Sequence, residues 1–218
     1  MELTSTLQRF VEPTKPIVLL GRIGLKKGDA TRERIIREAV EQTSVRGLTA
    51  VSLGDVAFAV GLSKSGLFKH FDSKEVMQQA VLEAVLARYR EVLLDGAEDL
   101  PPGRARLERL FDNWLTWMDN ACARGGCVLI AATIELDDQP GPLRDFLEDR
   151  QRRWRVTLIG ELQALTEPPL PLSVAEQAVF EMKSFILGYN EAFRLLRDVQ
   201  CGDHARAAFR GLLDRLTG

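Results

Sequence analysis

The residues best suited to ligand chemistry lie in one short stretch, VGLSKSGLFKHFDSKE, residues 60–75. Serines, lysines and a histidine alternate there with regularly spaced apolar residues. At about 100° per residue, Leu67 and Phe71 share one face of a helix, while Ser65 and Lys69 point the opposite way. Ammonium and hydroxyl groups on an exposed helix face can contact phosphates and the edges of bases. The stretch therefore predicts a surface that binds nucleic acid.

The distribution of charge along the chain favours the same reading. Residues 22–74 contain ten Lys/Arg and six Asp/Glu, a net charge of +4, although the whole chain of 218 residues has a formal net charge of -2. The remainder must therefore carry -6. This asymmetry indicates a basic N-terminal module that meets a polyanion, joined to an acidic module with another task. A random spread of surface charge is the alternative, and any single lysine here is as well explained as a solvated charge.

Three helices must position the basic stretch. Apolar residues 35, 36, 39 and 40 lie on one face of a helix that we expect from Thr31 to Gly47. Ser52 can cap a second helix, which Gly61 ends, and Ser63 can cap a third. Two short helices joined by a tight turn form a helix-turn-helix, which we place at about residues 52–71.

Residues from Thr31 to Met77 resemble the TetR family of bacterial one-component transcription regulators. The resemblance rests on motifs at the family's spacings: Arg34-Ile35-Ile36, Gly47, Ser52, Asp55-Val56-Ala57, Gly61-Leu62-Ser63, Gly66-Leu67-Phe68, His70-Phe71 and Ser73-Lys74-Glu75. It implies an all-helical homodimeric repressor with a small DNA-binding domain and a larger domain that binds an effector and dimerises. One departure is Phe68, where the family usually has a tyrosine whose hydroxyl holds a phosphate. The charge of Lys69 is a candidate replacement for that contact.

The whole chain is expected to be all-α, with about nine helices in three parts. Residues 1–28 form a flexible arm, residues 29–75 the DNA-binding domain, and residues 76–218 the domain for effector binding and dimerisation. In the last part we expect helices over residues 74–94, 104–123, 142–165 and 203–216, and one capped by Ser173 that runs to Val199. The segment CVLIAATIEL, residues 127–136, is apolar on every side and is expected to be a central buried helix.

The DNA contacts are expected from the arm, the first helix and the helix-turn-helix. Double-stranded operator DNA is the predicted partner, and Lys64 and Ser65 are expected to reach base edges while Lys69 and Lys74 meet phosphates. The candidate DNA-binding residues are Lys26, Lys27, Thr31, Arg32, Ser52, Ser63, Lys64, Ser65, Gly66, Phe68, Lys69, His70 and Lys74.

The acidic part is expected to hold a pocket for a small hydrophobic or aromatic effector and a seam between two protomers. Plain core packing remains the alternative for each pocket residue, and Glu135 could equally pair with Arg155 or lie at the surface. The candidate effector residues are Trp114, Trp117, Cys127, Ile130, Glu135, Met182, Phe185 and Tyr189. The candidate dimer residues are Ala178, Phe185, Ile186, Tyr189, Phe193, Ala208 and Leu212.

The sequence supports other classes of protein, such as enzymes and membrane proteins, less well. The sequence has no glycine-rich phosphate loop, nucleophile elbow or zinc spacing, so we expect no enzyme, metal or cofactor. No run of eighteen apolar residues indicates a membrane span, and three cysteines suit a reducing compartment, so a cytoplasmic location is expected. A helical adaptor that binds only protein, or a DNA-binding regulator without an effector, remains open.

Overall fold

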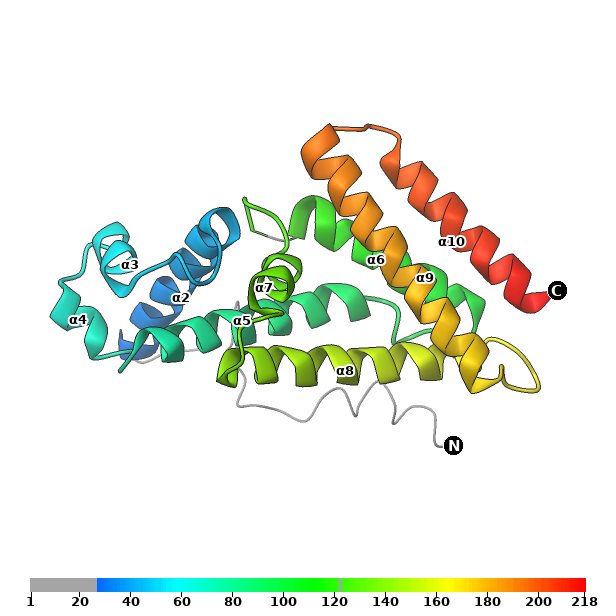
Figure 1. Ribbon diagram of the computed structural model, residues 1–218, viewed down its shortest axis with the longest axis horizontal. Helices are drawn as coiled ribbons and strands as arrows, with labels where there is room; N and C mark the ends of the chain where they lie inside the picture. The colour runs from blue at the N-terminus through cyan, green and yellow to red at the C-terminus, as the bar shows by residue number, and fades with distance from the viewer. Residues whose placement is uncertain (1–26, 122) are drawn as a thin grey trace. The chain divides into compact units, whose positions relative to one another are not determined.

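Figure 1 shows the computed structural model of the chain, which describes residues 27–121 and 123–218. These residues form nine α-helices and two short π-helical segments, so the prediction of an all-α chain is confirmed. They divide into two compact units. The helix-turn-helix unit comprises residues 27–90 and 123–149, and the C-terminal unit comprises residues 91–121 and 150–218.

The helix-turn-helix unit is built on a small apolar core. Its helices are α2 (Lys27–Arg46), α3 (Leu53–Ala59), α4 (Lys64–Phe68), most of α5 (Lys74–Leu94), α7 (Val128–Leu136) and the start of α8 (Pro142–Gln163). Ile35 from α2, Val56 from α3, Leu67 from α4 and Phe71 after it are all almost fully buried. These are the positions that the helical period of the sequence directs inward.

Two elements of this unit differ from expectation. Helix α2 begins at Lys27, four residues before Thr31, with Asp29 in its first turn, where a negative charge is favourable. Helix α7 was expected to be buried on every side, and this prediction is wrong for the single protomer. Ala132 and Leu136 are buried, but Ile134 is 68% exposed, because only one face of this nine-residue helix packs.

The C-terminal unit contains α6 (Arg104–Thr116), the π-helical segment η1 (Trp117–Ala121), the greater part of α8, α9 (Leu172–Glu191), the π-helical segment η2 (Ala192–Leu196) and α10 (Cys201–Thr217). Helices α9 and α10 run antiparallel side by side (Figure 1). Phe111 of α6 stacks on Phe209 of α10, with ring centroids 4.2 Å apart. In the interior, Arg106 and Glu161 form a buried ion pair of 3.2 Å.

Helix ends in this unit also depart from prediction. The helix expected over 104–123 changes to π-helical geometry at Trp117, and the helix expected to reach Val199 does so at Ala192. Helix α9 begins at Leu172 with Pro171 as the preceding cap residue, so Ser173 is not its cap. After η2, Arg197 has a left-handed backbone with φ 58°, which ends the helix.

Among the described helices, none has both the length and the apolar character needed to cross a membrane.

Candidate nucleic-acid interface

Helix α3 is fixed at its N-terminus by a capping box. The Ser52 hydroxyl accepts a hydrogen bond from the Asp55 backbone N–H at 3.1 Å, and the Asp55 carboxylate accepts one from the Ser52 backbone N–H at 3.3 Å. These bonds satisfy donors that the first turn of a helix leaves unpaired. Hydrogen bonds from the Ser52 hydroxyl and backbone, followed by the charge of Arg46, lower the pKa of Asp55. The predicted cap at Ser52 is confirmed.

The turn after α3 is closed by backbone hydrogen bonds. The Leu62 N–H donates to the Ala57 carbonyl at 2.9 Å, and the Gly61 N–H donates to the Phe58 carbonyl at 3.1 Å. This pair of bonds is a Schellman motif, and it requires a left-handed residue, which is Gly61 with φ 68°. Glycine suits this position because it has no Cβ. The turn therefore sets the direction in which the chain enters α4.

Helix α4 presents its cationic side chains outward. The Ser63 hydroxyl caps it by accepting from the Gly66 N–H at 3.0 Å, and the fully buried Leu67 fixes its rotation. Lys64, Ser65 and Lys69 are consequently exposed, and Phe68 is partly so. This is the exposed face expected from the sequence.

Several other candidate DNA-binding residues have partners within the protein. The guanidinium carbon of Arg32 lies 4.8 Å from the centre of the Phe71 ring, and the Lys74 ammonium donates to the Thr49 carbonyl oxygen. Lys27 is the first residue of α2, whereas Lys26 lies outside the described residues. His70 and Thr31 are half-buried. Lys74 is thus tied to a turn of the protein itself.

Glu135 also holds that turn. Its carboxylate accepts hydrogen bonds from the backbone N–H groups of Leu48 and Thr49, both at 2.7 Å, and another from the Thr49 hydroxyl. Gly47 has φ 90°, which turns these successive N–H groups toward one point and makes a site for an anion. A Cβ on Gly47 would lie 3.2 Å from a Glu135 oxygen. The sequence singled out Glu135 as an isolated acid but gave no sign of this partner.

The electrostatics of Glu135 follow from these contacts. Burial acts to raise its pKa, but hydrogen bonds from Thr49 and Leu48, together with the nearby charge of Lys74, outweigh burial and lower the pKa. The carboxylate is therefore ionised at neutral pH. An ionised Glu135 ties α7 to the turn that leads from α2 into the helix-turn-helix.

A second set of contacts ties the segment before α7 to α2. The Gly125 N–H donates to the Ser44 hydroxyl at 2.9 Å, and the Arg124 N–H donates to a Glu41 carboxylate oxygen at 3.2 Å. A Cβ on Gly125 would lie 2.0 Å from the Ser44 carbonyl oxygen, so only glycine permits this approach. Nothing in the sequence pattern indicated this contact.

The candidate effector residues are divided between the two units. Trp114, Trp117 and Met182 are buried in the C-terminal unit. There the Trp114 ring packs edge-to-face on the Trp154 ring, with ring centroids 6.0 Å apart. Phe185 is half-buried in the same unit. Cys127, Ile130 and Glu135 belong to the helix-turn-helix unit.

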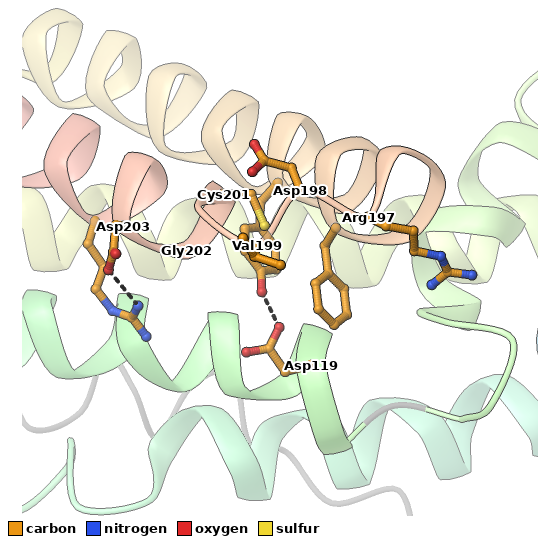
Figure 2. A pocket seen from close by; sticks show the side chains of 10 residues that line it. Asp119, Arg197, Asp198, Val199, Cys201, Gly202 and Asp203 are labelled. Atoms are coloured by element: carbon orange, nitrogen blue, oxygen red, sulfur yellow. Dashed lines mark hydrogen bonds and ion pairs between the residues drawn. The ribbon is translucent and has the colours of Figure 1, made fainter.

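Tyr189 of that set lines a pocket of about 370 Å³ in the C-terminal unit. Figure 2 shows the pocket, with Asp119 from η1 facing residues that follow η2. The Tyr189 hydroxyl donates to the Asp119 carboxylate. The pocket is also lined by residues that carried no common signal in the sequence, among them Phe193, Arg197, Asp198, Cys201 and Arg206.

The candidate dimer residues lie mostly inside the protomer. Ala178, Ile186, Tyr189 and Leu212 are buried, whereas Phe185, Phe193 and Ala208 are half-exposed. The exposed apolar side chains of α9 and η2 are different ones, and they include Phe180 (69%), Leu187 (54%) and Leu195 (75%). Within the protomer, the exposed apolar side chains of α9 are therefore not the candidate dimer residues.

Comparison with known sequences gives two matches that together cover most of the chain. A family described as "Bacterial regulatory proteins, tetR family" matches residues 35–81, and a "Tetracyclin repressor-like, C-terminal domain" matches residues 103–209. The chain is also 35% identical, over 83 residues, to the HTH-type transcriptional repressor KstR2 of Rhodococcus jostii (strain RHA1). That region is 36% of this chain and 39% of the relative. The chain spans less than two thirds of the length of the curated relatives that it matches.

Solved structures show the same fold. A TetR transcriptional regulator from Chloroflexus aurantiacus has a TM-score of 0.76 at 23% identity, over 88% of this chain and 96% of its own. A proposed transcriptional regulator from Saccharomonospora viridis, solved in complex with choline, has a TM-score of 0.70 at 19% identity, over 85% and 96% of the two chains.

Proposed function

The chain belongs to the TetR family of bacterial transcriptional regulators, and from this premise we propose that it is a repressor that binds a palindromic operator as a homodimer. A small, mainly apolar effector then releases it from the DNA. The repressor acts in the cytoplasm, where its operator lies. Residues 29–75 bind DNA, and residues 76–218 bind the effector and form the dimer.

The observation that carries the DNA-binding role is the geometry of α4. Its first turn is capped by Ser63, its buried face is fixed by Leu67, and its exposed face carries Lys64, Ser65 and Lys69. A helix held in this way can enter the major groove with its side chains in fixed positions. Lys64 and Ser65 read base edges, and Lys69 contacts phosphate in place of the hydroxyl that Phe68 lacks.

The remaining candidate DNA contacts support this helix. Lys26, Lys27, Thr31 and Arg32 meet phosphates from the N-terminal side, as a basic arm does when it reaches beyond a recognition helix. Lys74 and Ser52 position the helix-turn-helix, because Lys74 holds the turn at Thr49 and Ser52 caps α3.

The dimer forms through α9 and α10. The exposed Phe180 and Leu187 on α9 give an apolar surface, and Gly188 and Gly211 have open space around them, so a second copy can approach closely. An operator with two half-sites requires a two-fold symmetric reader. Phe185, Phe193 and Ala208 are half-exposed and can add to this interface.

The effector enters the C-terminal unit at the Tyr189 pocket. A regulator of the same fold has been solved with the small molecule choline, which supports a small ligand here. A regulator that responds to no small molecule is the alternative, and it gains weight from the close packing of Trp114, Trp117 and Met182. A helical adaptor is a weaker alternative, because it has no use for the exposed lysines of α4.

Fluorescence anisotropy with duplex DNA from around the gene of this protein tests the proposal. We expect affinity for one DNA segment to exceed that for an unrelated duplex, with both affinities falling as salt rises. Equal and weak binding to all duplexes at low salt would refute the role as an operator-binding repressor.

A further inference from the structure

The Tyr189 pocket contains a fixed carboxylate beside an aromatic wall. Tyr189 is buried, with only 5% of its surface exposed. Its hydroxyl donates a hydrogen bond to the Asp119 carboxylate, which a dashed line marks in Figure 2. The Tyr189 ring stacks on Phe193 with centroids 5.5 Å apart and planes 9° apart. The wall and the carboxylate are therefore held relative to each other.

The backbone around the pocket is irregular on two sides. Asp119 lies in the π-helical segment η1, and Phe193 lies in the π-helical segment η2. Arg197, which follows η2 and also lines the pocket, has a left-handed backbone. π-Helical turns and left-handed non-glycine residues are costly and occur often at functional sites. Residues from both irregular segments thus line one cavity.

The charges in the pocket do not cancel at Asp119. Arg206 is engaged by Asp112 at 2.8 Å and lies 4.0 Å from Asp203. The Arg197 side chain extends away from the Tyr189–Asp119 pair in Figure 2. Asp198 adds another carboxylate to the lining. The centre of the pocket is thus a site of negative charge next to aromatic faces.

The Tyr189 hydroxyl and the Cys201 thiol stay neutral at neutral pH and add no charge beside Asp119. Burial, followed by the hydrogen bond to Asp119, raises the pKa of Tyr189 far above its ordinary value. Burial, followed by the charge of Asp198, raises the pKa of the Cys201 thiol. A thiol that remains protonated is a poor nucleophile, which disfavours covalent modification as the use of this pocket.

We propose that the Tyr189 pocket binds a small organic cation, with its ammonium group against Asp119 and its apolar body on the faces of Tyr189 and Phe193. The attraction has two parts, an ion pair with the carboxylate and a cation–π contact with the rings. This inference rests on the proposed function, since it names the chemical class of the effector. The effector is then mainly apolar with a cationic head.

Isothermal titration calorimetry on the full chain at pH 7.5 tests the proposal with three matched probes. They are 2-phenylethylammonium, the neutral 2-phenylethanol, and the anion 3-phenylpropanoate. We expect the ammonium compound to bind at least about tenfold more tightly than the other two, since only it can pair with Asp119. Equal affinity for the alcohol, tighter binding of the carboxylate, or no binding of the ammonium compound would overturn the proposal.

Two variants locate the site. Asp119→Asn keeps an acceptor for the Tyr189 hydroxyl and removes the charge, so ammonium binding is expected to weaken by about tenfold. Asp95→Asn removes a charge from an exposed position of the same unit and serves as the control. If Asp119→Asn proves unfolded by circular dichroism, Phe193→Leu, which leaves the Asp119 hydrogen bond in place, must weaken ammonium binding several-fold. Unchanged binding in the folded variant would overturn the proposal.

The same samples separate this inference from the proposed function. If the chain binds its operator but not the ammonium probe, the cation site is wrong and the repressor stands. If the chain binds the probe but no DNA, the pocket is confirmed and the proposed function fails.

Discussion

Glu135 and Leu48, 87 positions apart in the chain, are joined by a hydrogen bond of 2.7 Å from the Leu48 backbone N–H to the Glu135 carboxylate. With the bonds from Thr49, this contact fixes the turn between α2 and α3 to α7. The Leu48 carbonyl oxygen is also held, by the Gln78 side chain of α5 at 2.8 Å. The entrance to the helix-turn-helix is therefore anchored by two helices that lie outside it in the sequence.

Removing the Glu135 carboxylate should destabilise the helix-turn-helix unit. Glu135→Ala leaves two backbone donors without their acceptor, and the loss of charge-assisted hydrogen bonds at this partly exposed site is expected to cost about 1–3 kcal/mol of unfolding free energy. Urea denaturation followed by circular dichroism measures the change. Asp138→Asn, a nearby exposed acid, is the control and should leave stability within about 0.5 kcal/mol of the parent. A Glu135→Ala variant as stable as the control would show that this contact contributes nothing.

The contribution of Glu135 should depend on pH. Its pKa is lowered in the folded protein from an ordinary value of 4.5, so its stabilisation is present above that value and is lost as the pH falls through the folded pKa. The difference in unfolding free energy between the parent and Glu135→Gln should therefore be constant from pH 7 to pH 6 and shrink below about pH 4.5. A difference that grows toward acid would contradict the assignment of an ionised carboxylate.

The exposed face of α4 predicts two kinds of DNA-binding variant. Lys69→Ala should weaken binding to every duplex to a similar degree and reduce the slope of log affinity against log salt by about one, because a phosphate contact carries no sequence information. Ser65→Ala or Lys64→Ala should change the preferred bases at a cost of about 1–3 kcal/mol for a direct contact. Anisotropy at two salt concentrations distinguishes them. Arg210→Ala, exposed on α10, is the charge-matched control. Unchanged affinity and salt slope in folded Lys69→Ala would remove this residue from the interface.

The exposed apolar face of α9 predicts a variant that no longer dimerises. Placing a charge there by Leu187→Glu should bury an unpaired carboxylate in the dimer and shift the mass in solution to that of a monomer. Sedimentation at micromolar concentration measures the mass. Val156→Glu, at a position of α8 that is similarly exposed (64%), is the control. A parent protein that is already monomeric, or a Leu187→Glu variant that is still dimeric, would contradict this interface.

The helix-turn-helix was predictable because its determinants are local. Ser52 caps with a residue three positions away, Ser63 does the same, and Gly61 supplies the left-handed backbone its turn needs. Side chains such as Leu67 follow the helical period inward. Capping and periodicity act within one or two helical turns, so a single sequence displays them. The family of the chain could be identified from the same stretch.

The contacts of Glu135, Arg124 and Gly125, and the lining of the Tyr189 pocket, were decided by the tertiary structure alone. Glu135 is a lone acid on an apolar helix. Nothing within a few residues of it specifies that its carboxylate oxygens accept hydrogen bonds from the backbone N–H groups of Leu48 and Thr49. In the same way, helical period placed apolar residues on α9 but did not say which face packs against its own protomer. Packing partners depend on how distant segments are brought together, and the pattern along one segment does not encode them. The sequence by itself determined the class of the fold and the DNA-binding motif, while the structure decided what anchors that motif and which residues line the Tyr189 pocket.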